Sequence, residues 1–235
     1  MINVGRIGIR WVSGVAALLV IVGVGVVGAA PLGVPAATTG AGKTALGAEV
    51  NAVLDRELTG GVSEAESTQV FAKGAIGIDD RLDIELRLGF GDVSIDPGGF
   101  DTDLGPAFGV GFKTTWARIP EAHLKIGSVV QTMRIRADDN NGVRTSWSEY
   151  DAALGVVFDV TGATDPKNRQ SQFSLMPYGG FAWSGVDFDT AGAVEDQSFG
   201  LFVGLGANLQ GNLRVGAELR LVDQTALSVS GGLVF

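Results

Sequence analysis

The last nine residues of the chain, Leu227-Ser-Val-Ser-Gly-Gly-Leu-Val-Phe235, decide its fold. Leu227, Val229, Leu233 and Phe235 fall on alternate positions, and serine and glycine fill most of the positions between them. Side chains on a β-strand point alternately to its two faces, so this spacing puts the four apolar residues on one face. The stretch therefore predicts a strand with one apolar face that ends on an aromatic residue.

Segments with the same two-residue period follow one another along most of the chain. Their apolar faces lie within residues 70–78, 82–90, 108–116, 124–130, 152–160, 173–183, 199–209, 213–221 and 227–235. Ala45–Leu58 also alternates, although its apolar residues fit one face of a helix as well. Turn residues separate the segments, which together predict an all-β chain.

The segment at residues 124–136 loses its phase. Val129 and Val130 are adjacent, and Met133 and Ile135 fall on the face opposite to the earlier apolar residues. One extra residue in a strand produces such a change, so we expect a β-bulge in this segment.

The lengths and connections of the segments indicate a membrane barrel. Most apolar faces run about 9–11 residues, the length of a tilted strand that crosses a bilayer. Aromatic residues gather near the strand ends, as they do at membrane interfaces. These aromatic residues are Phe90, Phe108, Trp116, Phe158, Phe173, Trp183, Phe199 and Phe235. Short connections at 79–80, 120–121 and 211–212 roughly alternate with longer ones at 59–67, 96–105, 138–148 and 187–197, with 162–171 and 223–225 as exceptions.

The series of strands that ends on phenylalanine resembles the small bacterial outer-membrane β-barrels of the OmpA/opacity type over residues 45–235. The resemblance implies an antiparallel up-and-down transmembrane β-barrel in which the last strand pairs with the first. Termini on one side of the membrane require an even strand number, so Ala45–Leu58 gives about ten strands, with eight as the alternative. The resemblance also implies that assembly machinery reads Leu227, Val229, Leu233 and Phe235. We expect no periplasmic C-terminal domain.

The N-terminal stretch has the layout of a secretory signal peptide. Two arginines precede the apolar run 11–27, and no charge follows until Lys43. Val34 and Ala36 offer small groups at the −3 and −1 positions, which predicts cleavage after Ala36. A transmembrane anchor is the alternative, because the uncharged run is long enough to span a bilayer.

The expected organisation is a signal peptide at residues 1–36, a flexible mature N-terminus at 37–44 and the barrel at 45–235. Cleavage would leave 15 basic and 26 acidic residues, so the formal net charge of −9 would become −11. This acidity argues against binding to nucleic acid. Ala37–Thr44 fits a relaxed phosphate-binding loop, but no βαβ pattern follows it, so we expect no nucleotide site.

No pattern indicates catalysis or a metal site. His123 is the only histidine, beside Pro120-Glu121 in a predicted periplasmic turn, and the chain has no Cys. Acidic residues cluster in the predicted external loops, at Glu64, Glu66, Asp101, Asp103, Asp138, Asp139, Glu195 and Asp196. No spacing among them matches a defined Ca²⁺ loop, so we expect them to be solvated. We therefore expect no catalytic residue, no metal and no cofactor.

The polar faces of the strands predict a charged lumen. The residues expected there are Asp83, Glu85, Arg87, Lys113, Asp151, Arg214, Glu218 and Arg220. These charges either neutralise one another and plug the barrel or line a narrow aqueous path. Barrels of about eight strands have interiors that side chains can fill, which favours the plug.

The sequence favours a non-catalytic protein of the bacterial outer membrane with a structural or surface-interaction role. The alternatives are a narrow porin-like passive channel for small solutes and, third, a soluble secreted lipocalin-like β-barrel binder. The expected partners of the monomer are outer-membrane lipids, lipopolysaccharide and the barrel-assembly machinery. Arg134 and Arg136 would contact lipopolysaccharide phosphates if they face outward, whereas the expected bulge would turn them into the lumen.

Overall fold

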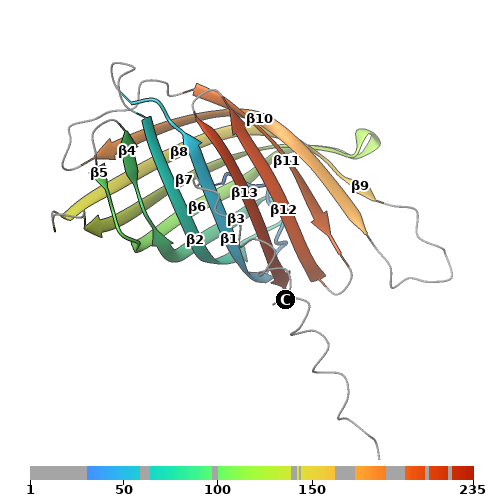
Figure 1. The fold of residues 1–235 in the computed structure, drawn as a ribbon. Helices are drawn as coiled ribbons and strands as arrows, with labels where there is room; N and C mark the ends of the chain where they lie inside the picture. The colour runs from blue at the N-terminus through green and yellow to red at the C-terminus, as the bar shows by residue number, and fades with distance from the viewer. Residues whose placement is uncertain are drawn as a thin grey trace, which may run out of the picture.

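Ten antiparallel strands close into one barrel in the computed structural model, which describes residues 31–58, 64–96, 100–138, 142, 144–161, 173–188, 199–209, 212–221 and 224–235 (Figure 1). The barrel strands are β1 (Thr44–Asp55), β2 (Glu64–Gly77), β3 (Leu82–Gly91), β6 (Gly105–Ile119), β7 (Leu124–Asp138), β8 (Arg144–Phe158), β10 (Ser174–Phe188), β11 (Phe199–Asn208), β12 (Leu213–Leu221) and β13 (Thr225–Val234). The connections hold the short strands β4 (Ser94–Asp96), β5 (Phe100–Asp101) and β9 (Val160–Thr161) and the 3₁₀ helix η1 (Pro120–Ala122). Within the described residues, no helix is long and apolar enough to cross a membrane.

The C-terminal strand closes the barrel, as the sequence predicts. β13 pairs with β1 from Ala45 opposite Val234 to Asp55 opposite Thr225. At the end of this seam, the backbones of Thr44 and Phe235 exchange hydrogen bonds of 3.3 and 2.8 Å. β1 also borders β2 on its other side. The ambiguous first segment is therefore a strand, and the strand number is ten rather than eight.

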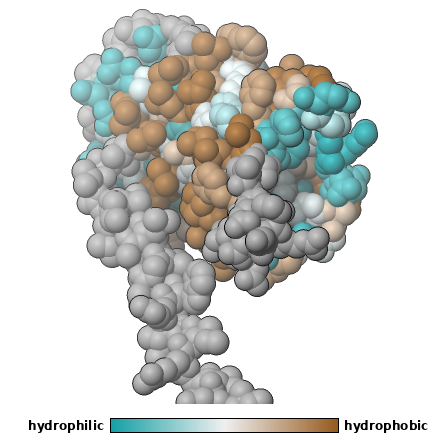
Figure 2. Space-filling model, turned by 90° about the vertical axis from the view of Figure 1, so that its right-hand side faces the viewer, coloured by the Kyte–Doolittle hydropathy of each residue, from teal (hydrophilic) through white to brown (hydrophobic). Residues whose placement is uncertain are grey.

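Apolar side chains cover the outside of the barrel. On β3, Leu86, Leu88 and Phe90 are 57–68% exposed, whereas Glu85 and Arg87, which alternate with them, are buried. Figure 2 shows hydrophobic residues spread over the wall that faces the viewer. A lipocalin-like barrel would turn its apolar face inward, so the observed arrangement is the one that suits lipid outside and charges inside.

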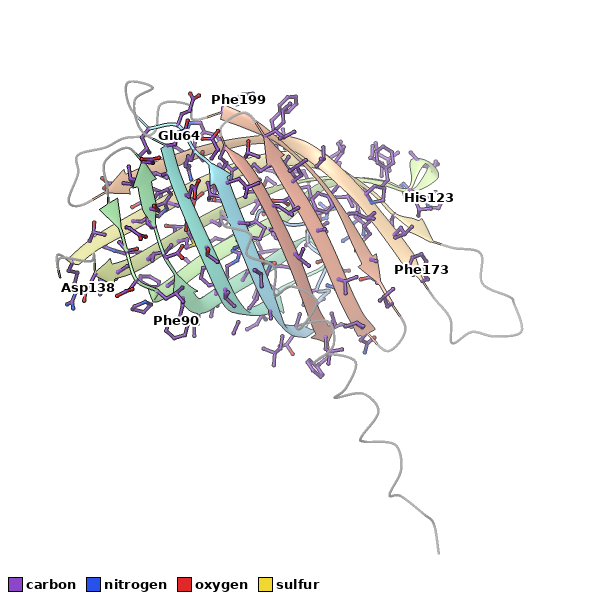
Figure 3. All side chains as sticks on the ribbon, in the orientation of Figure 1. Glu64, Phe90, His123, Asp138, Phe173 and Phe199 are labelled. Atoms are coloured by element: carbon purple, nitrogen blue, oxygen red, sulfur yellow. The ribbon has the colours of Figure 1, made fainter. Side chains whose placement is uncertain are left out.

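Aromatic residues lie on the outer surface near both ends of the barrel, as predicted. All eight predicted aromatic residues are exposed. Phe199 and Phe173 mark opposite ends, and His123 lies at the same end as Phe173 (Figure 3). We call the end that holds Thr44, Phe235 and the turns at 78–81 and 120–123 the terminal end, and the opposite one the loop end. The pattern resembles two aromatic girdles.

Several strands run further toward the loop end than predicted. β6, β7 and β8 each have 15 residues, and β2 begins at Glu64. Glu64, Glu66 and Asp138 therefore lie on strand ends rather than in loops. The predicted loop at 96–105 contains part of β4 and all of β5. Asp139, Glu195, Asp196 and the predicted turn at 162–171 lie outside the described residues.

The expected bulge in β7 is wrong. β7 pairs with β8 without interruption from Leu124 to Asp138, and the register shift in this region lies in β6, between Thr115 and Ala117. Met133 and Ile135 face inward and pack in an apolar cluster inside the loop end. An apolar interior explains the sequence pattern without a change of strand phase.

Candidate functional site

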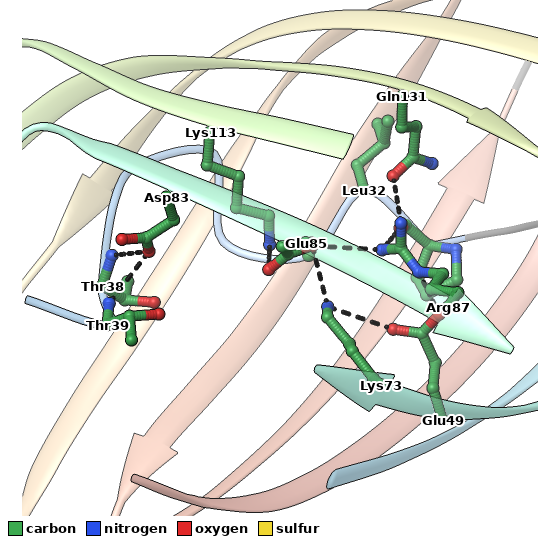
Figure 4. A network of polar contacts seen from close by, with 12 residues as sticks. Leu32, Thr38, Thr39, Glu49, Lys73, Asp83, Glu85, Arg87, Lys113 and Gln131 are labelled. Carbon is green, nitrogen blue, oxygen red and sulfur yellow. Dashed lines mark hydrogen bonds and ion pairs between the residues drawn. The ribbon is translucent and has the colours of Figure 1, made fainter. Parts of the chain in front are cut away.

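The lumen is the candidate functional site, because the structure brings all eight predicted charges there. Seven of them are nearly fully buried, and the eighth, Arg214, donates a 2.6 Å hydrogen bond to Thr38 O inside the barrel. Asp83, Glu85 and Arg87 follow one another along the inner face of β3 from the terminal end toward the centre (Figure 4). The period of two places them there: every second residue of β3 must point inward.

Three cations and two carboxylates form a cluster at the centre. Glu85 lies 3.1 Å from both Lys113 Nζ and Lys73 Nζ and 3.4 Å from Arg87 Nη2. Glu49 lies 2.9 Å from Arg87 Nε and 3.3 Å from Lys73 Nζ. Each carboxylate thus faces at least two cations. Removing any one charge from such a buried set leaves another without its full compensation.

Gln131 links this cluster to a second ion pair. Its amide oxygen accepts a 3.0 Å hydrogen bond from Arg87 Nη1, and its amide nitrogen donates one of 3.0 Å to Asp151. Asp151 also accepts a 2.8 Å hydrogen bond from Arg220 Nη1. Side chains from β1, β2, β3, β6, β7, β8 and β12 therefore join in one network across the lumen. The network pairs four cations with three carboxylates.

The predicted set lacks four lumen charges, which are Glu49 and Lys73 of the central cluster and the pair Arg56 and Glu149. Arg56 donates hydrogen bonds of 2.9 Å to Glu149 and 3.0 Å to Ser184, and its guanidinium lies 5.6 Å from the centre of the Trp147 ring. Both charged side chains are fully buried. Arg56 lies just beyond the end of β1, and Glu149 falls in a stretch that the sequence analysis left outside the alternating faces. Only the longer β8 reveals that Glu149 shares the inner face with Asp151.

An apolar cluster lies beside the Arg56–Glu149 pair at the loop end of the lumen. Phe71, Met133, Ile135 and Trp147 pack there with the other members of one buried cluster, which are Leu58, Ala65, Val93, Ile95, Ala107 and Val186. The β3–β4 connection brings Val93 and Ile95 into this cluster. These side chains fill the loop end as a hydrophobic core rather than as a channel mouth.

Backbone hydrogen bonds hold the β3–β4 connection in place. Val93 N–H donates to Thr102 Oγ1 over 2.8 Å, and Ser67 Oγ donates to Asp92 O over 2.7 Å. Thr68 N–H donates to the Asp92 carboxylate. Burial raises the pKa of Asp92 despite this hydrogen bond. The connection is therefore anchored to β2 directly above the apolar cluster.

The terminal half of the lumen is filled by residues 31–43, which the sequence analysis divided between the signal peptide and a flexible N-terminus. We call these residues the lumen segment. Leu32 and Ala36 are fully buried and pack against Val129, Val157 and Phe202 on the barrel wall. The segment then turns at Gly40 and Gly42 and enters β1, not a helix. The relaxed phosphate-loop pattern therefore lacks the helix that nucleotide binding requires.

Among the described residues, recesses lie beside the lumen segment. One has a volume of about 130 Å³ and is bordered by Lys73, Glu85, Lys113 and Arg214. Another, of about 150 Å³, lies toward the terminal end near Arg118, Lys125 and Asp159. Both border the lumen segment.

The remaining predicted residues lie outside the lumen. Leu227, Val229, Leu233 and Phe235 are exposed on the outer face of the closing seam. His123 ends η1 in the left-handed region at φ 51°. Within the described part of the chain, no group of three or more His, Cys, Asp or Glu residues could hold a metal ion.

Arg134 and Arg136 point outward. They alternate on β7 with the inward Met133 and Ile135, Arg136 is exposed, and Arg134 donates a 2.8 Å hydrogen bond to Ser146 Oγ. Because β7 keeps its phase, neither arginine turns into the lumen as the expected bulge would require.

The chain is similar in structure to known β-barrels, but it matches no protein family. No family profile matches the chain, and no curated protein matches its sequence. Similar solved structures include the β domain of the Bordetella autotransporter BrkA, with a TM-score of 0.48, 15% identity, and coverage of 84% of this chain and 100% of that one. The translocator domain of NalP from Neisseria meningitidis has a TM-score of 0.41 and 11% identity, with coverage of 83% of this chain and 88% of that one. The transport unit of AIDA-I from Escherichia coli has a TM-score of 0.40 and 11% identity, with coverage of 82% of this chain and 88% of that one. The barrel architecture of this chain rests on its own strand pairing.

Proposed function

We propose that this chain is a non-catalytic β-barrel of the bacterial outer membrane with a closed lumen and a structural or surface-interaction role. The observation that carries the proposal is an apolar outer wall around an interior that is filled at successive levels. The apolar wall suits lipid, and the occupied interior suits a protein that spans the membrane without passing solutes. The resemblance to OmpA/opacity-type barrels and the predicted signal peptide support a location in the outer membrane.

The filled lumen disfavours the narrow channel. A passive channel needs a continuous aqueous path, but the apolar cluster around Trp147 occupies the loop end and the lumen segment occupies the terminal half. Between them, the cluster around Glu85 and Arg87 is buried and internally paired. Water and ions would have to displace packed side chains at each of these levels.

Planar-bilayer recording tests the closed lumen. The purified protein, expressed from the full-length gene, is expected to give no discrete conductance steps under conditions in which a general porin gives them. Steps of reproducible size would favour the porin-like alternative and would overturn the closed-lumen function.

We also propose contact with lipopolysaccharide phosphates at the loop end. Arg134 and Arg136 face outward from one strand near that end, where phosphate groups of the outer leaflet would lie. Replacing both with Gln is expected to reduce the lipopolysaccharide that co-purifies with the barrel. An unchanged amount, measured as bound phosphate per protein, would remove this partner from the account. The exposed residues Leu227, Val229, Leu233 and Phe235 support the further proposal that the assembly machinery reads the closing strand.

A further inference from the structure

The lumen segment makes directed contacts through its backbone. Glu218 accepts hydrogen bonds from Leu32 N–H at 2.9 Å and Gly33 N–H at 2.8 Å. Asp83 accepts them from Thr38 N–H at 2.7 Å and Thr39 N–H at 2.9 Å. Each carboxylate thus binds two consecutive backbone donors. Gly33 has a φ of +67°, which glycine adopts without strain and which lets adjacent N–H groups converge on one anion.

Other lumen side chains form hydrogen bonds with the backbone of the lumen segment. Arg87 donates a 3.1 Å hydrogen bond to Pro31 O, and Thr115 Oγ1 accepts one of 3.1 Å from Ala37 N–H. Arg214 donates one to Thr38 O. The contacts run from Pro31 to Thr39 and use groups that any peptide presents. This half of the lumen is therefore built to hold a peptide backbone.

Glycines on the inner wall make room for the segment. A methyl group on Gly127 would overlap Pro35 O, and one on Gly155 would lie 2.8 Å from Pro35 Cγ. A methyl group on Gly206 would lie 3.2 Å from Val34 Cγ2. The inner wall therefore leaves space for the side chains and backbone of residues 34 and 35. Its charged groups bind the backbone of the residues on either side.

Cleavage after Ala36, which the sequence analysis predicts, would remove part of this fit. Glu218 would lose both of its backbone donors, and Tyr178 Oη at 3.2 Å would be its closest described donor. The space beside Gly155 and Gly206 would be vacated. A buried carboxylate that loses its hydrogen bonds is strongly destabilised, so a protein that discards Pro31–Ala36 would carry an avoidable defect.

We propose that residues 31–43 stay on the mature protein as a tethered peptide that occupies a peptide-binding lumen, and that the leader is cleaved before Pro31. Gly28-Ala29-Ala30 supplies small residues directly upstream, as leader cleavage requires. The inference rests on the export that the proposed function includes. It adds a ligand class, a peptide backbone, and assigns the chain's own N-terminal segment as the occupant.

The intact mass of the protein purified from membranes tests the cleavage position. The expected N-terminus lies at Pro31 or within the small residues directly before it, with the apolar run removed. An N-terminus at Ala37 would overturn the inference but leave the barrel function standing. Retention of the whole leader would instead count against export and hence against the proposed function, so the two failures are distinguishable.

A disulfide tests the position of the segment independently. The chain has no Cys, so Val34→Cys with Gly206→Cys creates a single pair whose side chains face each other. Under mild oxidation, the folded mature protein is expected to form this disulfide. The matched control, Val34→Cys with Leu205→Cys, places the second thiol on the neighbouring outward residue and is expected to stay reduced. Absence of the bond in a folded first pair, or equal oxidation of both pairs, would contradict a lumen segment.

Discussion

Replacing Arg87 with Met lowers the stability of the folded barrel by about 3–5 kcal/mol, the range expected when one partner of a buried ion pair is removed. Arg87 is 1% exposed and contacts Glu49, Glu85, Gln131 and Pro31 O. Met keeps much of the volume and removes the charge. The loss of stability then has two sources: the carboxylates that keep too little positive charge beside them, and the lost hydrogen bond to the lumen segment.

The temperature at which the folded gel band converts to the unfolded band gives the comparison, and denaturant titration in detergent gives the free energy. Arg144→Met is the matched control, because Arg144 pairs with Asp138 at 2.9 Å on the surface with 79% of its side chain exposed. An exposed pair of this kind contributes little to stability, because water screens the two charges. Adding Glu49→Gln to Arg87→Met is expected to recover part of the loss. Equal effects of Arg87→Met and Arg144→Met would contradict a stabilising lumen network.

Replacing Leu86 with Arg destabilises the membrane-embedded barrel by about 2–4 kcal/mol, the cost of an arginine on the lipid face near the bilayer midplane. Leu86 lies in the middle of β3, points outward and is 57% exposed. In lipid, the new guanidinium must either leave water or distort the bilayer. The outer-membrane fraction is expected to contain less folded protein.

Leu104→Arg is the control for this change. Leu104 is 64% exposed, so residue type, new charge and exposure are matched, but it precedes β6 at the loop end. The cost near a membrane interface falls to about 0–1 kcal/mol. In a soluble barrel the two exposed positions would tolerate arginine equally. Equal folded yields of the two variants would therefore place this wall in water and not in lipid.

The outer face of the barrel could be predicted from the sequence because it follows one rule. Each strand in contact with lipid must be apolar at every second position, and that period is visible without any partner strand. The same rule gave the charges of β3 and β12, which alternate cleanly. It was not enough for Ala45–Leu58, whose spacing also fits a helix. Closure with β13 decides that segment, and closure is a property of the whole chain.

The inside of the barrel could be predicted only in part because its chemistry changes along the axis. Met133 and Ile135 looked out of phase because the sequence analysis expected a polar interior throughout. The interior near Trp147 holds an apolar cluster beside the Arg56–Glu149 pair, whereas it is charged near Glu85, so alternation at the loop end places apolar residues on both faces. A β-bulge was the wrong explanation for that pattern.

The lumen segment could not be foreseen from local patterns. Its small residues resemble both the end of a signal peptide and a flexible linker, and its contacts span up to 186 positions in sequence, as between Leu32 and Glu218. The predicted lumen charges comprise four cations and four carboxylates, so the sequence gives no reason to expect another partner for Glu218 or Asp83. Only the three-dimensional arrangement shows that backbone N–H groups of the lumen segment bind both carboxylates.

The gel mobility of the membrane-extracted protein, boiled against unboiled, tests the central claim most directly. A closed barrel with continuous strand pairing from β1 to β13 resists detergent, so the unboiled sample from the outer-membrane fraction is expected to migrate differently from the boiled one. A soluble periplasmic protein without a heat-dependent shift would contradict the account, because an apolar outer wall would then have no lipid to face.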